Sequence, residues 1–295
     1  MPPIERLNQL AQRQRRRRFV LDCRGRSLVL GQKTCVMGIL NITPDSFSDG
    51  GLFYGVENAI RRGIQIAQEG ADILDIGGES TRPGALSVSS KEQISRVVPV
   101  IKKLAKKINI PISIDTSNAE VAQKAIIAGA SLVNDITGLR LDNNLAKVVA
   151  RYKAGCIIMH IKGTPHNMQK APRYKDLMKE ICLWLKQGIA IAMKAGVAKE
   201  RIIIDPGIGF GKTVLHNIEI IRNLSVLKRL GRPILIGTSR KSFIGKILAV
   251  PPNERLMGTA ASVALAIANG AHIVRVHDIK EMVQVARVTD AILLR

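Results

Sequence analysis

The feature that most constrains this chain is an alternation of short apolar runs with longer amphipathic segments, repeated eight times. The short runs have the length of strands and lie at residues 35–40, 72–76, 111–114, 131–133, 156–159, 201–204, 233–236 and 272–274. The longer segments have helical spacing and lie at residues 56–68, 91–106, 119–128, 145–152, 175–194, 218–228, 258–268 and 279–293. Repeated strand–helix units require right-handed crossovers and a parallel sheet. Eight such units without a linker predict an α/β fold, a closed (β/α)8 TIM barrel.

The chain before the first barrel strand divides into a basic head and a hairpin. Residues 1–18 are rich in arginine, with Arg13 and a run at 15–18, and we predict that they form a flexible tail. The apolar runs at 19–21 and 27–30 predict a β-hairpin that closes the N-terminal mouth of the barrel. Residues 19–295 then form a single domain, which agrees with a length of 295 residues.

Composition narrows the class of protein and its partners. No apolar run approaches the ~20 residues that span a bilayer, and no signal-like apolar stretch follows the basic head. We therefore expect a cytoplasmic protein. The four cysteines have neither paired nor metal-ligand spacing, so we expect neither a disulfide framework nor a zinc site. The net charge of +22 favours a nucleic-acid partner, but the cations are spread along the chain and aromatic residues make up only 3%. We therefore expect small-molecule substrates, without a nucleic acid or membrane partner.

A polar residue or group of residues follows each of the eight predicted strands. These are Asn41, residues 77–82 (GGESTR), Asp115, Asn134 with Asp135, His160, Asp205, residues 238–241 (TSRK), and Arg275 with His277. Any one of them can be explained as a cap of the following helix. In a (β/α)8 barrel, however, all of them surround one mouth, which is the face where such enzymes work. The pattern therefore predicts a catalytic site at this mouth.

Two kinds of chemistry can be separated within this ring. One set suits a flat heterocycle with a ring N–H and an exocyclic amine, because a carboxylate can accept both hydrogens. It comprises Asp115, Asn134, Asp205 and Lys241. The second set suits a phosphorylated group and comprises Asn41, Arg82, Arg275 and His277. For Arg275 and His277, a surface ion pair with Asp278 or Glu281 is the alternative.

Three segments rich in glycine lie at the predicted mouth. Residues 43–51 and 80–85 also contain serine and proline and are long enough to act as lids, although ordinary turn clusters are the alternative. Residues 205–212 (DPGIGFGK) superficially resemble a phosphate-binding loop. They lack the spacing of that motif and its final Lys-Ser/Thr, so they are a weak nucleotide signal.

Eight motifs in this chain resemble those of the dihydropteroate synthases, a family of pterin-binding enzymes. In the order of the family they are MGILNITPDSFSDGG from Met37, GESTRPGA from Gly78, ISIDT from Ile112, VNDITG from Val133, MHIKGTP from Met159, DPGIGFGK from Asp205, GTSRKSFIG from Gly237 and RVHD from Arg275. The likeness runs from about Phe19 to the C-terminus. Together these motifs are far more specific than any one of them.

The resemblance implies a transferase of folate biosynthesis. Such an enzyme condenses (7,8-dihydropterin-6-yl)methyl diphosphate with 4-aminobenzoate to give 7,8-dihydropteroate and diphosphate. The resemblance further implies that the diphosphate leaves before the amine attacks, that Mg²⁺ assists its departure, and that the protein is a homodimer and a sulfonamide target.

The resemblance also implies roles for individual residues. The pterin-binding set is Asp115, Asn134, Met159, Asp205, Lys241 and Arg275. The diphosphate-binding set is Asn41, Arg275 and His277, of which Asn41 also meets Mg²⁺. The 4-aminobenzoate side and its mobile loops contribute Asp45, Phe47, Thr81, Arg82, Pro83, Phe210, Ser239 and Lys241. The catalytic set is Asn41, Asp115, Lys241, Arg275 and His277.

Three other interpretations stay open from the sequence. The methyltetrahydrofolate methyltransferase domain of corrinoid systems shares pterin recognition but has no use for diphosphate ligands. A nucleic-acid-binding protein would show binding that weakens steeply with salt. An inactive paralogue would keep the barrel without its activity, and the complete polar ring argues against it.

Overall fold

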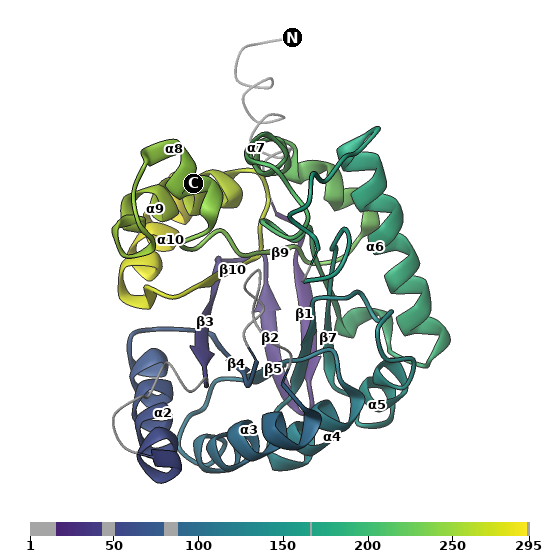
Figure 1. The fold of residues 1–295 in the computed structure, drawn as a ribbon, viewed down its shortest axis with the longest axis vertical. Coiled ribbons are helices and arrows are strands. Elements are labelled where there is room, and N and C mark those ends of the chain that lie inside the picture. The colour runs from purple at the N-terminus through teal and green to yellow at the C-terminus, as the bar shows by residue number, and fades with distance from the viewer. Residues whose placement is uncertain (1–15, 43–50, 80–87, 166, 294–295) are drawn as a thin grey trace.

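Eight parallel strands form a closed barrel with helices around it (Figure 1). The computed structural model describes residues 16–42, 51–79, 88–165 and 167–293. The barrel strands are β3 (Cys35–Asn41), β4 (Ile73–Gly77), β5 (Ile112–Asp115), β6 (Leu132–Asp135), β7 (Gly155–Met159), β8 (Ile202–Asp205), β9 (Leu235–Ile236) and β10 (Ile273–Val276). They are hydrogen-bonded in the order β8-β7-β6-β5-β4-β3-β10-β9. A parallel bridge between Ile204 and Ile234 joins β8 to β9 and closes the ring, so the predicted (β/α)8 barrel is confirmed.

The helices follow the predicted alternation, with three main differences. They are α2 (Gly51–Gln68), α3 (Ser90–Leu104), α4 (Ala119–Ala128), α5 (Leu145–Arg151), α6 (Leu177–Lys194), α7 (Val214–Arg222), α8 (Ser242–Leu248), α9 (Leu256–Ala268) and α10 (Ile279–Leu293), with 3-10 turns η2 (Lys199–Arg201), η3 (Leu224–Leu230) and η4 (Pro252–Glu254). The helix predicted at 218–228 was wrong at both ends, and α8 was not predicted. Helix α2 begins at Gly51, five residues before the predicted start at 56.

Local capping explains the position of α7. The Thr213 side chain accepts from the backbone N–H of His216, and the His216 side chain accepts from the N–H of Thr213, so the helix begins at Val214. At the other end, the Asn223 side chain donates to the carbonyl of Glu219, 3.1 Å away. Side chains that bond to nearby backbone in this way compete with helix propagation. The helix therefore ends at Arg222, and the chain continues as the 3-10 turn η3.

The barrel interior is apolar at the N-terminal ends of the strands, where a β-hairpin packs against it. Strands β1 (Phe19–Cys23) and β2 (Arg26–Leu30) pair antiparallel, which confirms the predicted hairpin. Its buried side chains pack with inward residues of seven barrel strands: Leu21, Cys23 and Leu30 with Cys35, Met37, Ile73, Leu132, Ile157, Ile203, Leu235 and Ile273. The hairpin thus closes the N-terminal mouth, as predicted, and the opposite mouth is left for the site.

The arginine-rich head is attached to the barrel at its last residues. Arg16 is buried and donates to the hydroxyl of Thr34 at 2.5 Å and to the carbonyl of Ala271 at 2.9 Å, and it forms an ion pair with Asp290. Because Thr34 precedes β3 and Ala271 precedes β10, this contact ties together the strands where the ring joins its first and last units. Arg16 therefore belongs to the barrel, although it lies three residues before Phe19, where the predicted domain begins. Residues 1–15 of the predicted tail lie outside the described residues.

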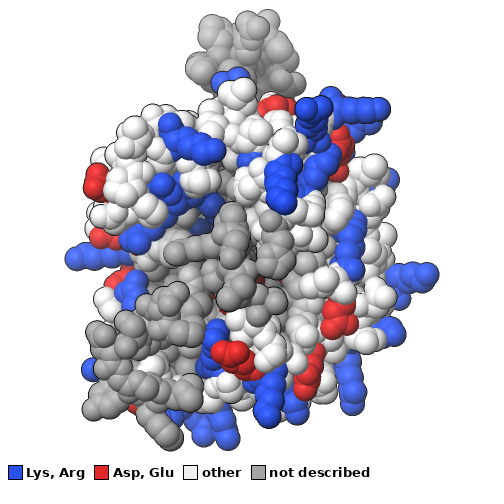
Figure 2. All heavy atoms as spheres, viewed as in Figure 1, with Lys and Arg blue, Asp and Glu red and all other residues white. Residues whose placement is uncertain are grey.

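Other properties expected from composition can be compared with the structure. None of the helices in the described ranges is long and apolar enough to cross a membrane. The four cysteines are buried and form no disulfide, as their spacing predicted. On the face shown in Figure 2, Lys and Arg side chains are distributed around the periphery with fewer acidic residues among them.

Candidate active site

The polar side chains of the site occupy the layer directly above the apolar plug. Successive residues of a strand face opposite sides, so a residue two positions after an inward apolar one also faces inward. Ile73, Leu132, Ile157, Ile203 and Ile273 belong to the apolar layer. Two residues further along the same strands stand Asp75, Asn134, Met159, Asp205 and Arg275. The interior of the barrel therefore changes from hydrocarbon to acceptors and a cation at the C-terminal mouth.

This layer brings the predicted pterin-binding residues together. One small cavity is lined by Asp115, Asn134, Ile136, Met159, Asp205, Ile208, Phe210, Gly237, Lys241 and Arg275. All six residues predicted to bind the pterin are among them. Its volume is about 20 Å³, little more than a water molecule needs.

Arg275 forms the centre of a buried charge network. Its Nε donates to Asp75 at 2.6 Å, and its Nη2 donates to Asp115 at 2.7 Å. Burial opposes the charged form of Arg275, but the two carboxylates outweigh it and raise its pKa. The surface ion pair considered for Arg275 is therefore wrong. Asp278 instead pairs with Arg240.

Asp75 is a residue of the site that sequence reasoning missed. It lies in the middle of β4, is completely buried, and also accepts from the amide of Asn134 at 3.1 Å. Its Oδ1 has no hydrogen-bond partner within the described ranges. The signal was present in the sequence, because Asp75 is two residues before Gly77 at the strand end and therefore faces the same side. A carboxylate between Leu74 and Ile76 is expensive to bury, which itself indicates a role.

The carboxylates that line the cavity are held in an environment that favours their neutral form. Burial raises the pKa of Asp115 to about 7, against the opposing charge of Arg275 and with the help of Asp75. Burial likewise raises the pKa of Asp205 to about 6, although the N–H of Gly207 donates to it at 2.7 Å. Groups whose pKa is shifted by burial and specific charges occur often at functional sites.

Lys241 and Phe210 close the cavity on its outer side. The ammonium of Lys241 lies 4.2 Å from the centroid of the Phe210 ring, a cation–π distance. Burial, together with the charge of Arg275, lowers the pKa of Lys241 to about 8. Phe210 is carried by a loop with three left-handed glycines, at Gly207, Gly209 and Gly211. A Cβ on Gly207 would come within 1.9 Å of the carbonyl of His160, so only glycine fits there.

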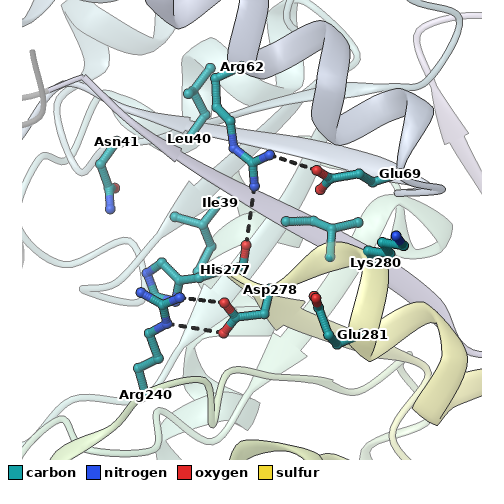
Figure 3. Close-up of a pocket in the computed structure, with 11 residues that line it drawn as sticks. Ile39, Leu40, Asn41, Arg62, Glu69, Arg240, His277, Asp278, Lys280 and Glu281 are labelled. Atoms are coloured by element: carbon teal, nitrogen blue, oxygen red, sulfur yellow. Dashed lines mark hydrogen bonds and ion pairs between the residues drawn. The ribbon is translucent and has the colours of Figure 1, made fainter. Parts of the chain in front are cut away.

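A second, more open cavity adjoins the rim of the barrel (Figure 3). Its volume is about 510 Å³, and its lining includes Asn41, Arg62, Arg240, His277 and Lys280. Arg62 donates to Glu69 at 2.9 Å and to the carbonyl of His277 at 3.5 Å, as the dashed lines in Figure 3 show. Asn41 and His277, predicted to meet the diphosphate, thus share a cavity with three cations and three carboxylates, Glu69, Asp278 and Glu281. Arg275, the third predicted diphosphate ligand, lines the inner cavity instead.

His277 is fixed by Ser239. The Ser239 hydroxyl lies 3.0 Å from Nδ1 of His277 and accepts from the backbone N–H of His277 at 3.2 Å. Burial, followed by the charges of Arg275 and Arg240, lowers the pKa of His277 to about 3, so its ring is neutral at pH 7. Ser239 is buried and lines neither cavity, which places its hydroxyl against His277 rather than in the pterin cavity.

His160, which follows β7, does not face the site. Its side chain is buried outside the strand ring, 5.4 Å from Trp184 of α6 between ring centroids, and its Nδ1 lies 2.9 Å from the ammonium of Lys212. The alternation of the strand explains this, because Met159 faces inward and the next residue must face outward. Five residues predicted for the loops lie outside the described residues: Asp45, Phe47, Thr81, Arg82 and Pro83.

The donors at the rim were compared with the needs of a divalent metal. Within residues 16–42, 51–79, 88–165 and 167–293, no group of three His, Cys, Asp or Glu side chains could hold an ion. Mg²⁺ commonly takes few protein ligands and uses substrate phosphates and water for the rest. The amide oxygen of Asn41 at the rim cavity fits that type of site.

Comparisons with known proteins decide the family. The pterin binding enzyme family matches residues 37–277. The chain belongs to the pterin-binding enzyme family. Within this family it is 52% identical to a dihydropteroate synthase of Synechocystis, over 89% of this chain and 91% of the other. A dihydropteroate synthase structure from Clostridium difficile is 51% identical, with a TM-score of 0.85 over 90% of this chain and 99% of the other.

A third relative has been solved with a bound small molecule. The structure of the dihydropteroate synthase of Xanthomonas albilineans with 4-aminobenzoic acid is 42% identical in sequence, with a TM-score of 0.87. It covers 94% of this chain and 98% of its own. The pterin-binding barrel of this family is therefore present along nearly its whole length, and the predicted membership among the dihydropteroate synthases is confirmed.

Proposed function

We propose that this member of the pterin-binding enzyme family condenses (7,8-dihydropterin-6-yl)methyl diphosphate with 4-aminobenzoate, releasing 7,8-dihydropteroate and diphosphate. Dihydropteroate synthases are 44–52% identical to it over most of the chain. The single observation that carries the proposal is the gathering of all six predicted pterin-binding residues around one inner cavity at the C-terminal mouth of the barrel.

The inner cavity supports pterin binding by its acceptors. Asp115, Asn134 and Asp205 offer carboxylate and amide oxygens to the ring N–H groups and exocyclic amine of the pterin. A bidentate carboxylate contact gives both affinity and orientation. Arg275 and Met159 pack on the ring in this arrangement, and Lys241 meets it from the outer side.

The rim supports the departure of the diphosphate. Asn41, Arg275 and His277 bind the diphosphate, and preorganised donors of this kind stabilise charge that develops on a leaving group. Bound Mg²⁺, held by Asn41 and the phosphate oxygens, would neutralise part of that charge as a Lewis acid. His277 acts as a neutral donor, because its low pKa leaves it unprotonated at pH 7. The bond to the diphosphate breaks first, and the electron-rich pterin stabilises the resulting exocyclic cation.

The outer wall of the inner cavity supports binding of the second substrate. Phe210 offers its ring face to 4-aminobenzoate, and the ammonium of Lys241 beside it suits the carboxylate. Asp45 and Arg82, which the family resemblance also assigns to this side, lie outside the described residues.

We also propose a cytoplasmic homodimer. Helices α7, α8 and α9 expose large apolar side chains, among them Leu215, Ile247, Met257 and Leu265, around an apolar groove lined by Ile221, Phe243, Ile244 and Leu248. Exposed apolar patches of this kind mark protein interfaces, and a second copy is the occupant we propose. Four cysteines without a disulfide agree with a reducing compartment.

The test is diphosphate release by the purified protein with and without 4-aminobenzoate, in Mg²⁺ or EDTA. The proposal expects Mg²⁺-dependent release coupled to stoichiometric dihydropteroate. No turnover by a folded protein that still binds the pterin would favour a methyltransferase-like or inactive barrel. The Asp205→Ala protein is the matched control, because removal of its carboxylate should abolish pterin binding without unfolding the barrel.

A further inference from the structure

Asp75 connects two strands of the site that do not touch each other. In the ring, β4 is separated from β6 by β5 and from β10 by β3. From β4, the same oxygen of Asp75 accepts from the amide of Asn134 on β6 and from Nε of Arg275 on β10. It does not line the pterin cavity itself. Its contacts therefore reach the substrate only through Asn134 and Arg275.

The first contact determines which end of the Asn134 amide faces the cavity. An amide has one donor end and one acceptor end, and its orientation is decided by its hydrogen-bond partners. A carboxylate such as Asp75 accepts only, so it takes the –NH₂ end of Asn134 and leaves the carbonyl oxygen as the end available to a ligand. Reversal of the amide would point a donor at the donor edge of the heterocycle.

The second contact determines the pose of the Arg275 guanidinium. Asp75 holds Nε and Asp115 holds Nη2, so carboxylates engage two of its five N–H donors from two neighbouring directions. Among the described residues, no side chain engages its remaining donors, which can serve a substrate. Without Asp75, only the contact with Asp115 would hold the planar group, and Asp115 is also a predicted pterin ligand.

The burial of Asp75 is difficult to explain by stability alone. The side chain is fully buried in an apolar strand, and its Oδ1 lacks a partner among the residues described. Buried carboxylates are rarely kept unless they are paired and hydrogen-bonded, and a hydrophobic residue would often be at least as stable. A buried polar atom without a partner calls for an explanation, and a positioning role supplies one.

From this geometry we propose that Asp75 is a positioning residue, which sets the acceptor polarity of Asn134 and the pose of Arg275. The inference rests on the proposed function, since it assigns Asp75 to the recognition of the pterin in that same site. Asp75 touches neither substrate, and its effect is on which heterocycles bind and how tightly.

The first arm of the test needs no substrate. Asp75→Ala and Asp75→Asn are prepared, and exchange of the Arg275 Nε–H with water is followed by ¹H–¹⁵N NMR, with the signal assigned by its loss in Arg275→Lys. The proposal expects slow exchange in the unchanged protein and at least about tenfold faster exchange in Asp75→Ala. Equal exchange rates would overturn it. This arm is decided even if the chain proves not to synthesise dihydropteroate.

The second arm measures pterin recognition without catalysis. Calorimetry with 6-hydroxymethyl-7,8-dihydropterin should show affinity at least about tenfold weaker in Asp75→Ala. In a double-mutant cycle with Asn134→Ala the two losses should be non-additive, because Asp75 acts through Asn134. Unchanged affinity in Asp75→Ala, or full additivity, would overturn the proposal. Failure of the unchanged protein to release diphosphate would instead count against the proposed function.

Asp290→Asn is the matched control for loss of stability. Asp290 is also a buried carboxylate paired with an arginine, but its partner is Arg16 at the opposite end of the barrel. The control should lower the melting temperature and leave both Arg275 exchange and pterin affinity unchanged. If Asp290→Asn reproduces the pattern of Asp75→Ala, the effects come from weakened folding and the positioning role is wrong. Asp75→Asn, nearly identical in shape, keeps the test available if Asp75→Ala does not fold.

Discussion

The Ser239 hydroxyl and Nδ1 of His277 lie 3.0 Å apart, and the same hydroxyl oxygen accepts the backbone N–H of His277 at 3.2 Å. A serine has one donor and two acceptor positions, so accepting from the backbone leaves its proton for Nδ1. We therefore assign the ring proton of His277 to Nε2. The rim cavity thus receives a histidine whose position and tautomer are both fixed by a neighbouring loop.

Ser239→Ala should weaken the use of the diphosphate without affecting the pterin. Loss of a neutral hydrogen bond costs about 1 kcal/mol, which corresponds to about fivefold in kcat/KM for the diphosphate substrate. Calorimetry with the hydroxymethyl pterin, which has no diphosphate, should give the affinity of the unchanged protein. An equal loss of affinity for the pterin alone would contradict this assignment.

Lys212 should stabilise the loop that carries Phe210. Burial lowers the pKa of its amino group, which lies 2.9 Å from Nδ1 of His160 and donates to the carbonyl of Phe210 at 2.9 Å. Lys212→Met leaves both of these groups without their partner, and each buried group left unpaired costs ~1–3 kcal/mol. We expect a melting temperature lower by ~5 °C or more, and a KM for 4-aminobenzoate that rises more than the KM for the pterin.

The control for this change is Lys186→Met, since Lys186 is an exposed lysine on α6. Its melting temperature, measured by differential scanning calorimetry, should lie within about 1 °C of that of the unchanged protein, because surface substitutions usually change stability little. If Lys212→Met has the same melting temperature as the control, the amino group of Lys212 does not stabilise the loop.

Pterin binding should weaken as the pH falls through 6. The pKa of Asp205 is raised to about 6 by burial, so the carboxyl takes up a proton below that pH and loses its capacity to accept two hydrogens. If binding requires one ionised carboxylate, each pH unit below its pKa weakens pterin binding about tenfold. Asp115, with a pKa of about 7, acts in the same direction. Calorimetry between pH 5 and 8 measures the slope.

Asp205→Asn provides the comparison for this dependence. The amide does not titrate, so the variant should bind the pterin weakly at every pH. Its pterin affinity should no longer fall as the pH drops through 6. A variant that retains the full step would show that another group is responsible.

Much of the site followed from the sequence because the fold leaves few alternatives. Parallel strands with right-handed crossovers bring all their C-terminal ends to one mouth, and period-two alternation then selects Asn134, Asp205 and Arg275 as inward residues. The same alternation would have excluded His160, which follows the inward Met159. This exclusion was missed in the sequence analysis. His160 was placed among the mouth residues because it is polar and follows a strand, without asking whether it faces into or out of the barrel.

The remaining features depend on partners that sequence spacing does not determine. The contacts of Asp75 with Asn134 and Arg275 each cross one intervening strand and rest on the register of the closed ring. The burial of Lys212 against His160 depends on how one loop folds over another. The start of α7 was misplaced because its cap is reciprocal between Thr213 and His216, a capping box without the usual Glu or Gln.

The apolar surface of α7, α8 and α9 should be covered in solution by a second copy of the chain. Met257 and Leu265 on α9 are 77% and 58% exposed, beside a groove that contains Ile247 and Leu248 of α8. A charge at the centre of such an interface must be desolvated without a partner, so Leu265→Glu should weaken association by about a hundredfold or more. Sedimentation equilibrium should show twice the chain mass for the unchanged protein and a concentration-dependent shift to the monomer for the variant.

Ile127→Glu is the matched control, because Ile127 on α4 is 62% exposed and far from the groove in sequence. If both variants sediment like the unchanged protein, the apolar face is not the dimer interface.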